Sequence, residues 1–392
     1  MTKNFARILL LGMICSLLLL LCFIVVASAQ EQKARPAHIG FIYPISSNGA
    51  EAGQHTNNFS FHVLAGISQQ ENAFCLSGVS NIVRKNAYGA MIAGLSNHAG
   101  GSIRGVQIAG FLNMVGEQAD GTQIAGFANV SDNCEGAQVA GFLNRADNVD
   151  GAQVAGFLNL AKDAGAQVGG FANIGKDADV QIAGFSNISK NSEAVQLSGF
   201  INKTNNAGTQ IAGFINIAKK VKGAQISGFI NIAEECDYPI GLVNIVKNGE
   251  KQLGLTIDES GNTLAAFRSG GRMLYGILGA GYNFNEHSSY VFEGGIGAHL
   301  NVNKWFRVNI EAVATCMTEF RHEAYFKSST RILAALKIAN RLELFAGPSF
   351  NHIQFDRYQT DIRNDRYFWS HKGRNSFNGM FFGGIAGIHV NL

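Results

Sequence analysis

Residues Gly105 to Ile232 repeat one short unit with few changes. The first four copies are GVQIAGFLN at Gly105, GTQIAGFAN at Gly121, and GAQVAGFLN at both Gly136 and Gly151. The next five are GAQVGGFAN at Gly165, DVQIAGFSN at Asp179, AVQLSGFIN at Ala194, GTQIAGFIN at Gly208 and GAQISGFIN at Gly223. A repeat of this kind indicates a fold built by stacking copies of one structural unit.

Weaker copies extend this array in both directions. Their Gln position is occupied by Cys75 and Met91 before the regular copies, and by Tyr238 and Lys251 after them. The Gln positions 75, 91, 107 and 123 are 16 residues apart, whereas 225, 238 and 251 are 13 apart. Terminal copies of an array are often irregular, because they face something other than another copy. The sequence therefore predicts a repeat domain over residues 71–257.

The unit is too long to be one straight strand in a coil that returns to its start, because a strand rises about 3.3 Å per residue. We expect a bend at the small residue and glycine, Ala109-Gly110 in the first regular copy. With that bend, Ile108 and Phe111 both face inward, and successive coils stack in parallel. The predicted fold is all-β: a parallel β-solenoid of about 13 short repeats.

Stacking predicts two structural columns with one residue per coil. The aromatic column contains Phe111, Phe127, Phe142, Phe157, Phe171, Phe185, Phe200, Phe214 and Phe229. The amide column contains Asn113, Asn129, Asn144, Asn159, Asn173, Asn187, Asn202, Asn216 and Asn231, and we expect it to form a ladder of amide hydrogen bonds. The Gln column is expected to do the same at the surface or at a corner.

Two other interpretations of the repeat remain open. The Gln and Asn columns could bind a ligand instead of serving packing alone. Each copy could also be one straight strand of an antiparallel membrane barrel, since its length and alternation suit such a strand. An antiparallel arrangement should make odd and even copies differ, and they do not, which favours the parallel solenoid.

The pattern changes in residues 258–392, which we expect to form an antiparallel, outer-membrane-type β-barrel. Six long, glycine-rich segments follow one another, beginning near 272, 289, 304, 329, 341 and 377. A barrel needs at least eight strands. The missing two would come from His38–Ile45 and Asn57–Ile67, or from Thr263–Arg268 and the region 357–371. A soluble β-sandwich is the alternative. The expected interfacial aromatics are Tyr275, Tyr282, Tyr290, Trp305, Phe306 and Phe345.

The longest polar loop, residues 356–375, mixes basic and aromatic side chains. Its candidate contact residues are Arg357, Arg363, Arg366, Trp369 and Lys372. Guanidinium groups bind phosphate and stack on rings, so this loop is a candidate contact for glycan, lipopolysaccharide phosphate or another surface protein. An ordinary solvated loop is the other interpretation.

The N-terminus has the features of an export signal. Lys3 and Arg7 precede an apolar run, and Ala27-Ser28-Ala29 matches a cleavage site, which predicts a signal peptide over residues 1–29. An uncleaved anchor is the alternative. Residues 30–70 are expected to form N-terminal strands that cap the repeats.

Composition and motifs limit the function further. The net charge of +3 provides no basis for nucleic-acid binding, and the cysteines have no metal-ligand spacing. The chain contains no recognisable catalytic motif. We therefore expect no catalytic, cofactor-binding or metal-binding residue, no cofactor, and no enzymatic activity.

The unit G-x-Q-(I/V)-A-G-F-x-N resembles the surface-repeat proteins of Gram-negative bacteria, and so does the segment FIYPISSNG that begins at Phe41. The resemblance spans residues 38–257. It implies an exported, surface-associated protein without catalysis. We expect a non-enzymatic scaffold at the outer membrane or cell surface, in contact with outer-membrane lipid. The alternatives are a secreted carbohydrate- or host-binding module and a glycan-active enzyme.

Overall fold

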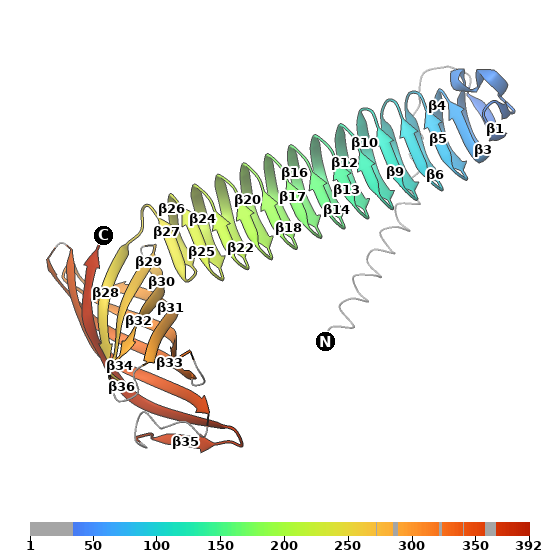
Figure 1. Cartoon of the computed structure of the whole chain (residues 1–392). Helices are drawn as coiled ribbons and strands as arrows, with labels where there is room; N and C mark the ends of the chain where they lie inside the picture. Colours follow the sequence, from blue (N-terminus) through green and yellow to red (C-terminus); the bar gives the residue numbers. More distant parts are fainter. Residues whose placement is uncertain (1–33, 272, 285–288, 321–323, 340, 357–365) are drawn as a thin grey trace. The chain divides into compact units, whose positions relative to one another are not determined.

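The computed structural model describes residues 34–271, 273–284, 289–320, 324–339, 341–356 and 366–392 (Figure 1). The predicted signal peptide, residues 1–29, lies outside this part of the chain. The described elements are β-strands, apart from one short 3-10 helix, η1 (Gly49–Gln54). The chain divides into two compact units, Met1–Gly169 and Gly170–Leu392, which are described in turn.

The first unit begins with strands β1 (Arg35–Ile42), β2 (Ile45–Ser46) and β3 (Thr56–Ser68). Strand β1 pairs in parallel with β3 and antiparallel with β2. The first half of β3 pairs with one strand of the following coil and its second half with the other. Strand β3 is therefore itself a coil, and the stack begins before the first recognisable repeat.

Each later coil of this unit has a long strand and a short strand. The long strands are β4 (Gln70–Ser77), β6 (Ala87–Ala93), β8 (Ile103–Ala109), β10 (Gln118–Ala125), β12 (Asn133–Ala140), β14 (Asn148–Ala155) and β16 (Asp163–Gly169). The short strands are β5 (Ser80–Val83), β7 (Ser96–Ala99), β9 (Leu112–Val115), β11 (Ala128–Val130), β13 (Leu143–Arg145) and β15 (Leu158–Leu160). Long strands pair with long strands and short with short, always in parallel. This confirms the parallel solenoid and excludes the antiparallel meander.

The second unit begins with the same arrangement. Its long strands are β18 (Asp177–Ala183), β20 (Asn191–Ser198), β22 (Asn206–Ala212), β24 (Lys220–Ser227) and β26 (Glu235–Ile240). Its short strands are β17 (Ala172–Ile174), β19 (Ser186–Ile188), β21 (Ile201–Lys203), β23 (Ile215–Ile217), β25 (Ile230–Ala233) and β27 (Val243–Val246). They pair in the same parallel register. The last coil therefore ends at Val246.

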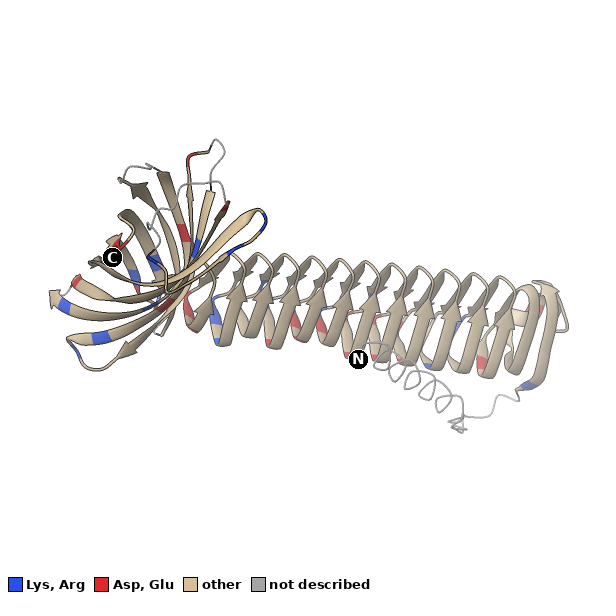
Figure 2. Cartoon of the chain, turned by 90° about the horizontal axis from the view of Figure 1, so that it is seen from below, with Lys and Arg blue, Asp and Glu red and all other residues tan. Residues whose placement is uncertain are grey.

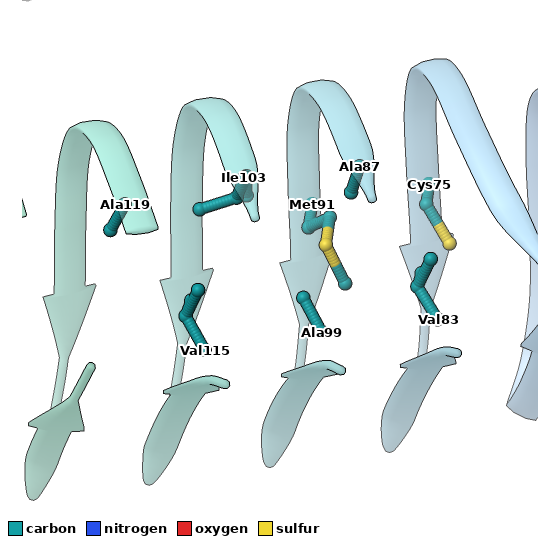
Figure 3. Packing of buried hydrophobic residues seen from close by; sticks show 8 residues of the cluster. All are labelled: Cys75, Val83, Ala87, Met91, Ala99, Ile103, Val115 and Ala119. Carbon is teal, nitrogen blue, oxygen red and sulfur yellow. The ribbon is translucent and has the colours of Figure 1, made fainter. Parts of the chain in front are cut away.

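The space enclosed by a coil is thin, and small side chains fill it. In the coils of Figure 3, Cys75 faces the same interior as Val83, and Ile103 faces the same interior as Val115. Both bend and turn bring the two strands close together, so a bulky side chain has little room between them. This geometry explains why alanine, cysteine and valine occupy the buried apolar positions.

The rest of the interior consists of amides. In the first unit Asn129 donates to Asn144 Oδ1 at 2.9 Å, and Asn144 donates to Asn159 Oδ1 at 3.0 Å. Asn144 also donates to the carbonyl oxygen of Val154, 2.8 Å away. The Gln column forms a second ladder, in which Gln138 donates to Gln123 at 2.8 Å. Both columns are fully buried, and the amides bond from coil to coil, with additional bonds inside one coil such as that from Gln138 to Ser131 Oγ at 3.1 Å.

Two expectations about the repeat were wrong. Phe111 and Ile108 point outward, with 46% and 38% of their surface exposed. The Gln column, expected at the surface or a corner, is in the interior. The reason is that the thin interior holds planar amides, and a ladder satisfies their hydrogen bonds. The rings stack outside instead, with centroids 4.7 Å apart between Phe111 and Phe127.

The predicted bend lies at Gly110 and Phe111, between the long and the short strand of the coil. Gly126 shows why this position is glycine: an added Cβ would collide with the carbonyl oxygen of Gly110 in the preceding coil. Coils stacked at the spacing of hydrogen-bonded strands leave no room for a side chain here.

The second unit ends in an antiparallel sheet of nine strands. These are β28 (Lys251–Asp258), β29 (Asn262–Gly270), β30 (Leu274–Asn283), β31 (Ser289–Asn301), β32 (Phe306–Thr318), β33 (Ala324–Ala339), β34 (Leu342–Asp356), β35 (Trp369–Lys372) and β36 (Ser376–Asn391). Strand β28 pairs with both β29 and β36, so all of them except β35 close into a ring of eight. The predicted barrel is therefore confirmed as a β-barrel.

The two strands missing from the sequence prediction are β28 and β29. The expectation for Thr263–Arg268 was right, because this segment lies in β29. The N-terminal strands belong to the solenoid instead, and of the region 357–371 only residues 366–371 are described. The copy expected at Lys251 is β28, an antiparallel barrel strand, so its similarity to the repeat does not make it a coil.

Substitution of Asn144 tests the amide ladder. Asn144→Asp removes the donor and places a carboxylate against two oxygen acceptors, whereas Asn144→Ala only removes the amide. We expect Asn144→Asp to lower the stability of the solenoid more than Asn144→Ala, which itself costs about 1–3 kcal/mol for the unsatisfied neighbours. Arg145→Ala, on the same strand but exposed, is the control and should be nearly neutral. Denaturant unfolding followed by circular dichroism measures all three, and equal effects of Asp and Ala would contradict the ladder.

Candidate functional site: a barrel with an apolar wall and a charged lumen

The barrel strands alternate between an apolar outer face and an inner face on which charged and polar side chains lie among buried apolar ones such as Ile277, Leu333 and Ile353. On β33, Lys327, Ser329 and Arg331 are buried, whereas Phe326 and Ile332 are more than half exposed. The outer surface continues along this strand and the others with Leu253, Leu255, Ile257, Leu278, Phe292, Ile296, Ile310, Leu336, Leu344, Phe350, Phe382 and Ile388, all well exposed. A water-soluble protein seldom exposes so many large apolar side chains in one continuous surface.

The lumen holds a network of buried ion pairs, and Figure 2 marks where Lys, Arg, Asp and Glu lie along the barrel strands. Arg268 Nε lies 2.8 Å from Glu311 Oε1, and Tyr275 donates its hydroxyl proton to the same oxygen at 3.0 Å. Arg331 Nη2 lies 2.6 Å from Glu293 Oε2. Burying a charge is costly unless it is paired, and each of these cations has a carboxylate partner.

Further pairs lie toward both ends of the barrel. Arg307 contacts Glu343 at 2.9 Å and Glu250 at 2.7 Å. Near the turn between β28 and β29, Lys327 pairs with Asp258. An eight-stranded barrel is just wide enough for its own side chains. The lumen is therefore filled by these side chains together with buried apolar ones, among them Leu264, Val291, Met317 and Phe381, and forms a packed core.

Two of the expected interfacial aromatics are in the lumen. Tyr275 and Phe345 are almost fully buried, and they stack on His299 and His389 with centroids 4.1 Å apart in both pairs. Glycine-rich strands gave the sequence analysis no reliable alternation, so the face of an aromatic residue could not be assigned. Tyr290 and Trp305 are exposed, at 52% and 68%.

The candidate contact residues of the long loop are only partly described. Arg357 and Arg363 lie outside the described residues. Trp369 and Lys372 are the first and last residues of β35, which pairs with β36 outside the ring, and both are exposed, as is Arg366. The structure thus places three of the five residues on the outside of the barrel, around one edge strand.

The last coil continues directly into one end of the barrel. The backbone N–H of Asn244 donates to Ser269 Oγ at 2.9 Å, and its side-chain amide donates to the Ser269 carbonyl oxygen at 3.0 Å. The final member of the Asn ladder therefore finds its partners on β29. We call this the coil end of the barrel, and the opposite end the loop end.

The first coil contains a second polar cluster, which the sequence analysis did not identify. His62 Nε2 lies 3.2 Å from His38 Nδ1, and His38 Nε2 lies 2.9 Å from Ser46 Oγ. Ser60 donates to the buried carboxyl group of Glu71 at 2.7 Å, and Asn57 donates to it at 3.2 Å. These side chains occupy the interior that amide ladders fill in later coils. The signal that the sequence offers is the spacing of Ser60 and His62, which share one face of the expected strand Asn57–Ile67.

Burial decides the protonation of this cluster. It raises the pKa of Glu71 to about 7, despite the opposing hydrogen bonds from Ser60 and Asn57. It lowers the pKa of His38 to about 4, with a smaller contribution from the neighbouring His62. At neutral pH His38 and His62 are therefore uncharged in the folded first coil. Glu71 keeps its proton up to a pH of about 7.

Comparisons with protein-family models, curated proteins and solved structures find no match. The resemblance of the repeat to the surface-repeat family therefore stays a prediction. Among the described residues, no three histidine, cysteine, aspartate or glutamate side chains gather as a metal site would require. Within the same residues, no helix has the length and apolar character needed to cross a bilayer.

Glu71→Gln tests the protonation of Glu71 in the buried polar cluster of the first coil. The folded protein holds the Glu71 proton more tightly than the unfolded chain, so the contribution of Glu71 to wild-type stability falls as pH rises from 4.5 to about 7 and is then constant. Gln keeps the hydrogen-bond acceptor without this penalty. We expect the variant to gain up to about 3 kcal/mol relative to wild type at pH 8 and nothing at pH 4. His38 and His62 are present in both proteins, so their own pH dependence cancels in this comparison. A difference between the two proteins that does not change with pH would contradict the assignment.

Proposed function

We propose that this chain is a non-enzymatic scaffold protein of the outer membrane, in which the barrel is the lipid-embedded anchor and the solenoid is the part it holds in place. The exposed apolar wall of the barrel carries the proposal. A wall of Leu, Ile and Phe around buried Arg–Glu pairs suits contact with acyl chains, and such a wall is typical of outer-membrane barrels.

The dimensions of the barrel support the same proposal. The ring has an even number of strands, eight, which is the smallest size among such proteins. Strands β30 to β32 have 10 to 13 residues, and about 9–11 residues span the hydrocarbon core. The packed lumen supports anchoring rather than transport.

The connections between strands suggest the orientation of the anchor. At the coil end the chain needs only short turns, from Gly270 to Leu274, from Asn301 to Phe306 and from Ala339 to Leu342. At the loop end three connections are also short, from Asp258 to Asn262, from Asn283 to Ser289 and from Thr318 to Ala324, whereas the fourth, from Asp356 to Ser376, is the longest of the barrel and contains β35. Outer-membrane barrels have short periplasmic turns and longer external loops. We infer that the coils next to the barrel are on the periplasmic side, and that β35 faces outside.

This orientation divides the expected partners between the two sides. Arg366, Trp369 and Lys372 would meet glycan, lipopolysaccharide phosphate or another surface protein, whereas the coils would present their faces to the periplasm. The first alternative function is a secreted carbohydrate- or host-binding module, and the second is a glycan-active enzyme. The apolar barrel wall disfavours the first, because a secreted module has no lipid to cover such a surface.

A charge on the barrel wall tests the anchor. Ile332 is near the middle of β33 and points outward, so Ile332→Arg would place a cation at the centre of the bilayer, at a cost of about 2–4 kcal/mol. We expect this variant to fold less efficiently into lipid vesicles, measured as loss of the heat-resistant gel form. The matched control is Met114→Arg, which is outward-facing on a coil in a column that already contains Arg145. Equal folding of both variants, or wild-type protein recovered in the soluble fraction of cells, would overturn the proposal.

Cysteine labelling with a membrane-impermeant maleimide tests the orientation. We expect Lys372→Cys to be labelled in intact cells, and Lys219→Cys, in an exposed turn of the second unit, only after the outer membrane is permeabilised. Labelling of Lys219→Cys in intact cells would instead show the coils at the cell surface.

A further inference from the structure

The first unit carries a continuous apolar stripe on the outside of its coils. One column runs along the long strands in hydrogen-bonded register, with one residue per coil: Phe61, Leu76, Ile92, Ile108, Ile124, Val139, Val154 and Val168. The stacked rings of Phe111, Phe127, Phe142 and Phe157 follow this column around the bend. Ile39, Phe41, Phe59 and Val63 widen it on the first strands, where they are 49% to 61% exposed.

The stripe is larger than a monomer ordinarily exposes. Its seven phenylalanines are 38% to 57% exposed. At roughly 150–250 Å² for a whole aromatic residue, they present about 600 Å² by themselves. Adding the Ile, Leu and Val side chains brings the stripe to about the 800 Å² that each partner contributes to a standard protein interface. Single-chain proteins rarely leave a patch of this size uncovered.

The composition of the stripe favours a protein over a lipid surface. Its columns contain Phe, Ile, Leu and Val, and none of the Trp, Lys or Arg residues by which peripheral proteins hold a bilayer surface. A further outward column on the long strands, beyond the one that contains Val106 and Thr122, contains Arg104, Asp120 and Glu135, and Arg104 pairs with Asp120. These carboxylates would repel anionic headgroups.

The regular spacing of the stripe suits a second stripe of the same kind. Each column presents one side chain per coil, so ridges and grooves alternate with the period of the strands. Two such faces can interdigitate in the way that β-sheets pack, and a two-fold axis would use the same patch on both copies. The charged turns, such as those at Glu117 and Asp132, connect the strands at the other edge of the coil from the bend, and Figure 2 shows charged residues toward one edge of the coils.

We propose that the apolar stripe of the first unit is the interface through which two copies of this chain associate side by side. The proposal is independent of the membrane anchor, because it rests on the solenoid alone.

Cross-linking of the full-length chain in cell envelopes, or in whichever cell fraction contains it, tests the pairing. Ile124→Cys and Val154→Cys place thiols on the stripe, and Met114→Cys places one on the outward face of a short strand, away from the column. All are made in a Cys316→Ser background, because Cys316 is partly exposed and could react with the cross-linker. The other described cysteines, Cys75, Cys134 and Cys236, are buried. With a short bismaleimide we expect a covalent dimer from the stripe positions and not from Met114→Cys.

A second pair of variants shows whether the stripe itself holds the dimer. Adding Val139→Lys to Ile124→Cys sets like charges against each other and should abolish the dimer band, whereas adding Met114→Lys should leave it. Circular dichroism confirms that both variants fold. Equal cross-linking at the stripe and at Met114→Cys, or none at any position, overturns the proposal. Stripe thiols that resist aqueous maleimide without cross-linking would also overturn it, and would point to lipid or a different protein as the cover.

Discussion

The solenoid depends on amide hydrogen bonds that run from coil to coil through its interior. Asn144 shows the constraint: its donors go to Asn159 and to Val154, both supplied by the next coil. A buried amide without such partners costs more than it contributes. A single coil could therefore not be stable alone. Each coil is stable because its neighbours place the same amide at the equivalent position of their short strand. The array must also end on something that completes the ladder, and Ser269 of the barrel does so for Asn244.

The same constraint determines what the outside of the coils looks like. Since the thin interior is filled by alanine and amides, the large apolar side chains of the repeat have no place inside. Phe111 and its equivalents stack on the surface, where each ring covers part of the next. Polar groups are thus buried in the solenoid through ladders and in the barrel through ion pairs such as Arg268–Glu311, while large apolar side chains also lie on the outside of both. In both cases the burial of polar groups is possible because the partners are present in fixed geometry.

Much of the fold could be predicted from the sequence, because few folds are compatible with such a repeat. The period of 13 to 16 residues and the absence of odd–even alternation were enough to predict parallel coils with a bend at glycine. The glycine-rich segments after residue 270 were enough to predict an antiparallel barrel. The faces of the side chains were not predictable, since apolar residues were assumed to point inward. Ile108 and Phe111 were misplaced in the coils for this reason, and Tyr275 and Phe345 in the barrel for lack of a clear alternation.

The sequence by itself determined the parallel stacking, since identical residues at a constant period can satisfy one another only in register. It also determined that Gly110 and its equivalents mark a bend. Only the tertiary structure decided which side of each strand is buried, because the volume enclosed by a coil or a barrel depends on how the strands close. It likewise decided that Lys251–Asp258 closes the barrel against Ser376–Asn391 instead of adding one more coil, since that pairing joins segments at opposite ends of the domain.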